Sequence, residues 1–277
     1  MSELVGAVTD AIASGRLGPR LWLYANYHCN LACGYCLTES APDAPRRELD
    51  ADLMHTLAGE AAELGFTSIG ITGGEPFLRP ELPALAAGLS EVLPVLVLTN
   101  GTLFDGDRIE RLAPIIGADV ALQISLDAAR ADQNDPMRGS GNFAKVVDAI
   151  PRLRERGVGV RIATTDYGQG ADAIEDVTDL VRSLGIPSED HVIRPTAARG
   201  RAVDAGMGET AGIDELPAEA TVTVDGLFWS PFAPTIRGGR LDTDLLVSRQ
   251  IRPLEAGLRA FLGLISSAPP AEAARFR

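Results

Sequence analysis

The chain has 277 residues, of which 45% are hydrophobic, and a formal net charge of −13. This length is enough for one large domain or two small ones, whereas the acidic charge argues against nucleic acid or an anionic membrane as a partner. No uncharged apolar run reaches the ~18–20 residues that a bilayer span needs, and the acidic N-terminus is unlike a secretory signal, so we expect a cytoplasmic protein with no membrane partner.

Apolar segments that favour strands alternate with amphipathic segments that favour helices along most of the chain. The predicted helices cover residues 2–14, 50–64, 80–91, 106–116, 142–156, 172–184 and 253–266. The predicted strands cover residues 21–26, 67–72, 94–98, 119–126, 158–165 and 191–194. These strands are mostly continuous apolar runs, which are typical of a parallel sheet covered by helices. We therefore predict an α/β fold, a partial (βα)6 barrel of the TIM type with a short C-terminal cap.

Beyond about residue 197 the alternation of strands and helices ends. Residues 196–217 predict loops, and residues 222–229 predict a hairpin whose turn is Asp225-Gly226. The tail, residues 267–277, is expected to be frayed. We therefore expect three parts, which are an N-terminal helix (1–19), a partial barrel (20–200) and a C-terminal extension (201–277).

All three cysteines of the chain, Cys29, Cys33 and Cys36, follow the first predicted strand. An odd number packed this tightly argues against a framework of disulfides. Three thiolates with this C-x3-C-x2-C spacing can each bind one iron of a 4Fe–4S cluster, which leaves the fourth iron open to a substrate. A zinc ion that also binds His28, or three unrelated buried thiols, are the alternatives.

Polar or glycine-rich segments follow the next three predicted strands. They are Gly73-Gly74-Glu75-Pro76, Thr99-Asn100-Gly101 and the pair Ser125 and Asp127. Because parallel strands end at one edge, where barrel enzymes build their active sites, we expect these segments to meet the cysteines there. Each also has a simpler interpretation as a turn, and Glu75 as an acid that complements a helix dipole.

The cysteine spacing, with the aromatic Tyr35 before the last cysteine, resembles the signature of the radical S-adenosylmethionine (SAM) enzymes. Residues 73–76 are similar to the Gly-Gly-Glu-Pro motif with which that family binds the amino group of SAM. The resemblance covers about residues 20–200. It implies that the open iron chelates SAM, and that one electron from the cluster cleaves SAM to a 5′-deoxyadenosyl radical. Glycine would let the backbone approach SAM closely, and proline would fix the turn.

Further segments resemble the subgroup of this family that modifies peptides and related substrates. The resemblance implies that Ser125 and Asp127 contact the carboxylate or ribose of SAM. Arg138 lies in a stretch similar to one of that subgroup, in which Asn134 replaces a histidine; a surface ion pair is the alternative for this arginine. The SAM site implied in this way comprises Tyr35, Gly73, Gly74, Glu75, Pro76, Asn100, Ser125, Asp127 and Arg138.

The start of the C-terminal extension resembles the SPASM or twitch domain of the same subgroup. A cysteine would stand there near Ser230, but neither it nor any later cysteine is present. We therefore expect a single 4Fe–4S cluster and a cluster-free cap, in which Trp229 or Phe232 faces the substrate and Arg237 is available to a polar group. Four arginines of this region could form a basic patch for an anionic substrate, or they could be solvated, namely Arg194, Arg199, Arg201 and Arg237.

The resemblance implies an oxygen-sensitive biosynthetic enzyme that abstracts hydrogen from a peptide or a small metabolite, as in the maturation of a natural product or a ribosomally made peptide. It also implies an electron donor such as flavodoxin or ferredoxin. A non-enzymatic iron–sulfur protein, for electron transfer or redox sensing, is an alternative, and so is an inactive barrel that acts as a scaffold. An electron carrier would use four protein ligands and would not need the Gly-Gly-Glu-Pro segment.

Overall fold

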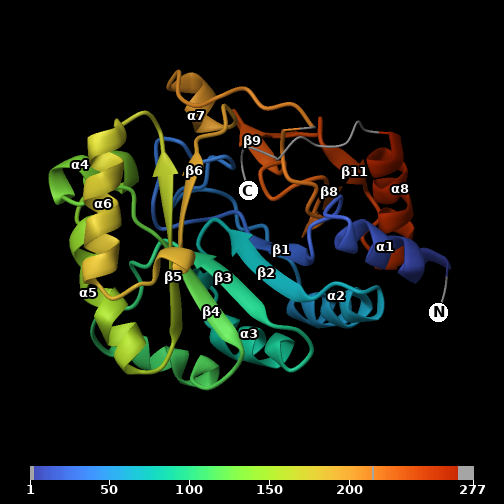
Figure 1. Cartoon of the computed structure of the whole chain (residues 1–277), viewed down its shortest axis with the longest axis horizontal. Coiled ribbons are helices and arrows are strands. Elements are labelled where there is room, and N and C mark those ends of the chain that lie inside the picture. The colour runs from blue at the N-terminus through green and yellow to red at the C-terminus, as the bar shows by residue number, and fades with distance from the viewer. Residues whose placement is uncertain (1–2, 214, 268–277) are drawn as a thin grey trace.

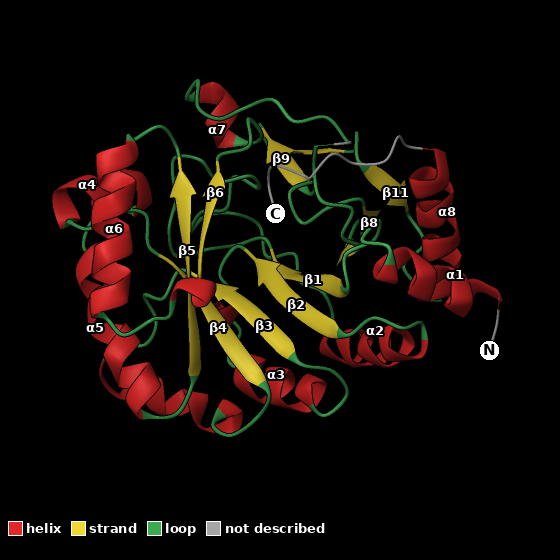
Figure 2. Ribbon diagram, in the orientation of Figure 1, coloured by secondary structure: helices red, strands yellow, loops and turns green. Residues whose placement is uncertain are grey.

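The computed structural model describes residues 3–213 and 215–267, in which a curved sheet carries helices on its outer side (Figures 1 and 2). The strands are β1 (Arg20–Asn26), β2 (Ser68–Gly73), β3 (Val95–Thr99), β4 (Val120–Ser125), β5 (Gly159–Asp166), β6 (His191–Pro195), β7 (Thr221–Thr223), β8 (Gly226–Phe228), β9 (Thr235–Arg237), β10 (Arg240–Asp242) and β11 (Leu246–Ser248). The helices are α1 (Glu3–Ala13), α2 (Ala51–Glu63), α3 (Leu82–Ser90), α4 (Ala131–Arg138), α5 (Asn142–Glu155), α6 (Ala171–Ser183), α7 (Arg201–Asp204) and α8 (Leu254–Ser267), with 3-10 helices η1 (Pro76–Leu78), η2 (Gly106–Ile115) and η3 (Ser188–Asp190).

Strands β1 to β6 pair in chain order, and every pair is parallel. The complete sheet has nine strands in the order β11-β8-β7-β1-β2-β3-β4-β5-β6. Within the described residues, β6 and β11 are therefore its two edges, and the sheet does not close into a barrel. This arrangement confirms the predicted α/β fold with a parallel sheet of the partial-barrel type.

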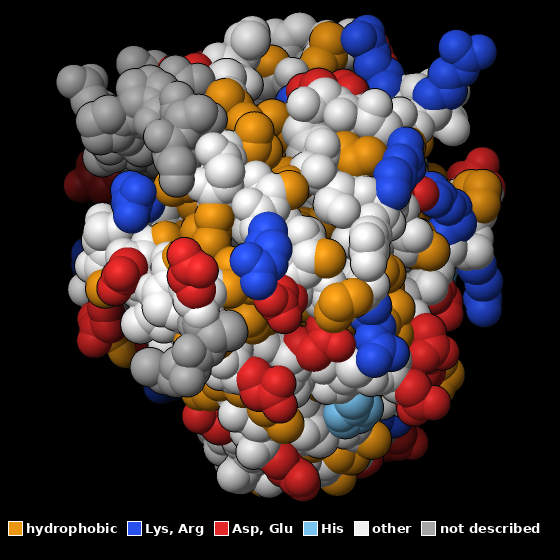
Figure 3. All heavy atoms as spheres, turned by 90° about the vertical axis from the view of Figure 1, so that its right-hand side faces the viewer, with side chains coloured by type: hydrophobic (Ala, Val, Ile, Leu, Met, Phe, Trp, Pro, Cys, Tyr) orange, Lys and Arg blue, Asp and Glu red, His pale blue; other side chains and the backbone are white. Residues whose placement is uncertain are grey.

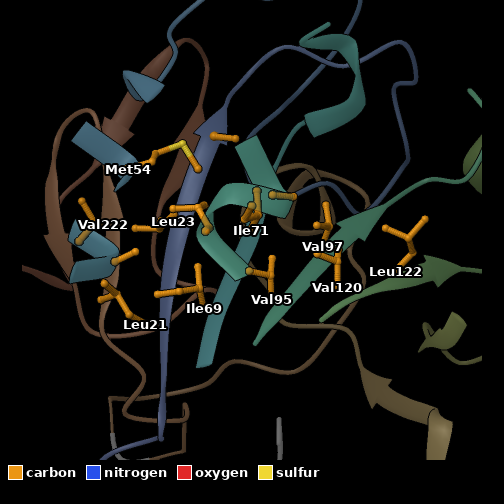
Figure 4. Packing of buried hydrophobic residues seen from close by; sticks show 14 of the residues in the cluster. Leu21, Leu23, Met54, Ile69, Ile71, Val95, Val97, Val120, Leu122 and Val222 are labelled. Carbon is orange, nitrogen blue, oxygen red and sulfur yellow. The ribbon is translucent and has the colours of Figure 1, made fainter. Parts of the chain in front are cut away.

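The two faces of the sheet differ because successive residues of a strand point to opposite sides. Figure 4 shows one face, on which alternate aliphatic residues of β1 to β4 pack together with Met54 of α2. The residues between them, such as Trp22 and Tyr24 of β1 and Gln123 of β4, line a cavity on the other face. The helices thus cover a hydrophobic outer face, and the inner face is left for polar chemistry.

The C-terminal region adds strands to this same sheet. β7 pairs in parallel with β1, so that Trp22 lies opposite Thr221, and β8 returns antiparallel to β7. The predicted hairpin is therefore confirmed, although its turn is Val224-Asp225 and Gly226 already pairs with Thr223, and the predicted last helix corresponds to α8. In Figure 1, α8 lies beside α1. Of the tail predicted to fray, residues 268–277 lie outside the described residues.

Two predicted segments need correction. The segment expected as a regular helix over 106–116 is the 3-10 helix η2, and it contains Pro114, which cannot donate a backbone hydrogen bond and disfavours an α-helix. Helix α4 was not predicted, because its sequence is polar and contains Pro136. The residues expected as loops over 196–217 contain the short helix α7.

None of the helices in the described ranges has both the length and the apolar character that crossing a membrane requires. Figure 3 shows the face on which α1 and α8 lie. Acidic and basic side chains are scattered there among apolar ones and do not gather by kind.

Gly70 of β2 offers a direct test of packing on the inner face. A Cβ at this position would lie 2.2 Å from the Trp22 ring, so we expect Gly70→Ala to lower the free energy of unfolding by ~1–3 kcal/mol. Gly59→Ala is the matched control, because that Cβ would meet nothing within 4 Å and should stabilise α2 by ~0.5–1 kcal/mol. Urea unfolding measures both, and equal stability of Gly70→Ala and wild type would contradict the packing.

Candidate active site

Most of the residues predicted from the sequence to bind the cluster or SAM line one cavity. It opens at the edge where β1 to β6 end, and segments from both the barrel and the C-terminal region line it. Nine of the twelve predicted ligands of the cluster or of SAM line this cavity, namely Cys29, Cys33, Tyr35, Cys36, Gly73, Gly74, Asn100, Ser125 and Arg138. Glu75, Pro76 and Asp127 lie behind it.

The three thiols are free, and all three cysteines line the cavity. Cys29 is buried, and its sulfur accepts the backbone N–H of Leu31 at 3.4 Å and the amide of Asn100 at 3.7 Å. Burial, and after it the charge of Glu75, raises the pKa of Cys29 to about 12. A thiol in such surroundings becomes a thiolate when a metal binds it, and the two N–H donors suit a charged sulfur.

The arrangement of the thiols distinguishes between a cluster and a single metal ion. Within residues 3–213 and 215–267, no three His, Cys, Asp or Glu side chains converge closely enough to hold one metal ion. His28, the fourth ligand of the zinc alternative, faces Glu48 at 3.6 Å and does not line the cavity. Because the thiolates of a 4Fe–4S cluster bind three different irons, they need not converge on one point. The donor set therefore fits such a cluster better than zinc.

The two glycines after β2 pack directly against the start of the cysteine segment. Gly73 has φ 146°, a backbone conformation that side chains rarely adopt, and Gly74 donates its N–H to the Asn26 carbonyl at 2.9 Å. A Cβ at Gly74 would lie 2.1 Å from the His28 carbonyl oxygen. The absence of side chains here is thus required for contact between the loops after β1 and β2, whatever ligand the cavity holds.

Glu75 points away from the cavity and joins two loops. Its Oε1 accepts hydrogen bonds from the Phe77 N–H at 3.0 Å and the Thr99 hydroxyl at 2.9 Å, and its Oε2 accepts the Asn100 N–H at 2.8 Å. Burial raises the pKa of this carboxyl to about 7, although these donors act in the opposite direction. Glu75 also caps η1, which begins at Pro76. Both residues therefore hold the loops of the site in place, and their contact with SAM stays a prediction.

Tyr35, Asp127 and Arg138 form a buried group on the other side of the cavity. Tyr35 donates its phenolic hydrogen to Asp127, and Arg138 donates to both of them, to Asp127 at 3.2 Å. Asp127 is fully buried and orients the other two, and its contact with SAM stays a prediction. Arg138 is not the surface ion pair of the alternative, since its side chain is only 6% exposed.

Two details of this group concern the fit of an anionic ligand. The Nε atom of Arg138 is buried and has no hydrogen-bond partner within the described residues. Arg138 also lines the cavity, where its charged guanidinium suits the carboxylate of SAM. Asn134, which stands where the subgroup has histidine, accepts the Asp127 N–H at 3.1 Å and donates to Asn142 at 2.8 Å. It supports the group from behind.

Several lining residues were not identified from the sequence. They come from the inner face of the strands or from loops, and include Tyr24, Thr72, Gln123, Thr164, Thr165 and Thr196. The sequence did contain a signal for two of them, because Thr72 and Gln123 are polar residues inside otherwise apolar strands. Alternation along each strand would have placed them on the same face as Ser125.

The residues expected to form a lid separate into two groups. Phe232 lines the cavity as expected. Trp229 does not, because its ring stacks on Phe261 of α8 with 4.8 Å between centroids and its Nε1 donates to the Ile213 carbonyl at 3.0 Å. Arg237 is exposed and pairs with Asp204 at 2.6 Å.

Of the two alternatives for the four arginines, a basic patch for an anionic substrate is not what the described residues form. Arg199 pairs with Asp244 at 2.7 Å, Arg237 pairs with Asp204, and Arg201 donates to backbone carbonyls. Arg194 is the member of this set that lines the cavity, and burial lowers its pKa. Carboxylates and carbonyls of the protein itself therefore neutralise most of the positive charge that the sequence suggested for a substrate.

Comparison of the sequence with known proteins identifies one family of enzymes. The profile described as the radical SAM superfamily matches residues 24–184. The AdoMet-dependent heme synthase of Methanosarcina barkeri is 32% identical over 160 residues, which cover 57% of this chain and 45% of that protein. The subtilosin biosynthesis protein AlbA of Bacillus subtilis is 30% identical over 177 residues, covering 63% of this chain and 39% of AlbA. The chain thus spans less than half the length of these relatives.

Solved structures show the same fold. Streptococcus suis SuiB bound to S-adenosylmethionine superposes with a TM-score of 0.56 at 19% identity, and the match covers 68% of this chain and 43% of SuiB. Native anSMEcpe with bound AdoMet and the Cp18Cys peptide gives a TM-score of 0.59 at 14% identity, over 91% of this chain and 84% of that one. At these identities the likeness concerns the fold alone.

The role assigned to Glu75 can be tested by stability. In Glu75→Gln one acceptor oxygen becomes an NH2 group that faces the N–H and O–H donors of Phe77, Thr99 or Asn100. We expect a loss of ~1–3 kcal/mol in the free energy of unfolding, because a buried donor then has no acceptor. The same change at the exposed Glu63 should shift it by less than ~0.5 kcal/mol. Chemical denaturation compares the two, and a neutral Glu75→Gln would refute this role.

Proposed function

Since the chain belongs to the radical SAM superfamily, whose members use a 4Fe–4S cluster and SAM, we propose that it is an enzyme that cleaves SAM reductively and abstracts hydrogen from its substrate in a biosynthetic pathway. One observation carries the proposal. The three cysteines and most of the residues that match the family's SAM motifs line one cavity at the carboxyl edge of the sheet. Barrel enzymes build their active sites at this edge.

Different residues of the protein would bind the 4Fe–4S cluster and SAM. Cys29, Cys33 and Cys36 would hold the cluster, which when bound supplies the electron that cleaves SAM. Ser125 and Arg138 would bind the carboxylate of SAM, since both line the cavity and a guanidinium can pair both oxygens of a carboxylate. Asp127 and Tyr35 keep Arg138 in its orientation through their hydrogen bonds. The backbone at Gly73 and Gly74 would meet the amino end of SAM.

The substrate that we propose is a peptide or a small metabolite. Relatives named for peptide products support the first, such as AlbA of subtilosin biosynthesis and the PqqA peptide cyclase of Ruegeria pomeroyi. The heme synthase of Methanosarcina barkeri supports the second. The proposal includes a flavodoxin or ferredoxin as electron donor, a cytoplasmic location without membrane or nucleic-acid partners, and an oxygen-sensitive cluster. It also keeps the division at residues 1–19, 20–200 and 201–277, with the last part as a cap without a cluster.

The cluster itself can be tested by analysis of metal content. We expect anaerobic reconstitution to give about four irons and four sulfides per chain, and Cys29→Ala, Cys33→Ala or Cys36→Ala to abolish the formation of 5′-deoxyadenosine, because a cluster that loses a ligand is labile. Circular dichroism controls for folding of each variant. Eight irons per chain, or zinc in protein purified without oxygen, would show that the site has been misassigned.

The contact of Ser125 with SAM gives a separate test. Ser125→Ala removes one hydroxyl from the wall of the cavity, so we expect the dissociation constant of SAM to rise by about 5-fold, equal to about 1 kcal/mol. Iron content should stay that of the wild type, because Ser125 contacts no thiol in the described structure. Isothermal titration with SAM measures the effect, and the exposed Ser183→Ala is the control. Unchanged SAM affinity would place Ser125 outside the SAM site.

A further inference from the structure

Arg201, at the start of α7, forms hydrogen bonds with the segment that carries the three cysteines. We define residues 29–40 as the cysteine loop. The Nη1 of Arg201 donates to the Cys33 carbonyl at 3.1 Å, and its Nη2 donates to the carbonyls of Glu39 at 2.7 Å and Ser40 at 2.9 Å. One guanidinium therefore spans the loop from its second cysteine to its end, which the planar fork of arginine allows and a single ammonium does not.

The backbone beside Arg201 makes a second contact with the same loop. The Arg201 N–H donates to the Cys36 carbonyl at 3.0 Å. Gly200 has φ 55°, and a Cβ there would lie 2.4 Å from the Cys36 carbonyl oxygen and 2.3 Å from that of Leu37. The approach is thus close enough to require glycine at position 200.

The turn between β9 and β10 contacts the loop from another part of the C-terminal region. The Ile236 N–H donates to the Leu37 carbonyl at 3.2 Å. Gly238 and Gly239 donate their N–H groups to the two carboxylate oxygens of Glu39 at 2.9 and 3.3 Å. Both glycines have positive φ, and successive amides in that conformation form a concave site for an anion. Glu39 itself has φ 49°, an uncommon conformation for a side-chain residue that these bonds hold.

We propose that residues 200–201 and 236–239 act together as a clamp that holds the cysteine loop in the conformation that binds the cluster. The residues of the clamp donate to the backbone carbonyls and the Glu39 carboxylate of the loop, so they are positioning residues. A loop that is already ordered loses less conformational entropy when the cluster binds, and it releases iron more slowly. The inference rests on the proposed function, and it assigns a role to a C-terminal region that has no cysteine of its own.

Iron release and hydrogen exchange test the clamp. In reconstituted full-length protein we expect Arg201→Ala to transfer iron to a ferrous chelator on the order of 10-fold faster than wild type. In the same chain before reconstitution, amides of residues 33–40 should exchange on the order of 10-fold faster. Arg201→Lys should lie between, since it keeps the charge but cannot reach all three carbonyls. Arg259→Ala is the matched control, because it removes an exposed arginine of the C-terminal region that pairs with Glu255 of α8 and lies outside the clamp.

The outcomes separate the clamp from the proposed function. Wild-type rates of both iron release and exchange in Arg201→Ala would overturn the clamp. If wild type binds no iron, the proposed function fails, while the exchange measurement still decides whether these residues order the loop. Should Arg201→Ala not fold, Glu39→Gln and Arg201→Lys provide the same test, because Glu39→Gln weakens the contact with Gly238 and Gly239 alone. Faster exchange confined to residues 33–40 in these variants would support the clamp, and no change would overturn it.

Discussion

The backbone amides and carbonyls of the cysteine loop form hydrogen bonds with residues outside the loop. These bonds determine the arrangement of the site. A chain segment without helix or strand must find partners for its amides and carbonyls elsewhere. Gly34 donates to the Met137 carbonyl at 3.0 Å, the carbonyl of His28 just before the loop accepts from Glu75 at 3.0 Å, and Arg201 binds the Cys33 carbonyl. Segments that are distant in the sequence thus set the positions of three thiols.

Buried charges tie these segments to one another. Glu75 links the loops after β2 and β3, and Asp127 links Tyr35 of the cysteine loop to Arg138 at the end of α4. A buried charge is tolerated only with partners, so displacement of one segment would leave a charge unpaired in another. The polar side of the sheet therefore behaves as a connected network, whereas the aliphatic residues in Figure 4 supply the stability of the opposite side.

The sequence predicted the parallel sheet and the edge that carries the site, because apolar runs and strand-end motifs both depend on local patterns. It did not predict the direction of each side chain at that edge. Ser125 is the last residue of β4, and Glu75 and Asp127 lie just beyond the ends of β2 and β4. The two carboxylates turn inward, where they accept the backbone N–H groups of Asn100 and Thr165, respectively. Trp229 stacks on Phe261, a contact between residues far apart in the sequence. Strands of three residues, such as β9 and β10, are too short for periodicity to identify.

The central claim is that three cysteines hold a cluster with one iron open to SAM, and electron paramagnetic resonance of the reduced, reconstituted protein tests it most directly. Addition of SAM should change the g-values of the cluster signal, because SAM becomes a ligand of the open iron. S-adenosylhomocysteine serves as the comparison in a parallel titration. A signal of a 4Fe–4S cluster that SAM leaves unchanged at saturating concentration would indicate a closed cluster, as in an electron carrier, and would contradict the account.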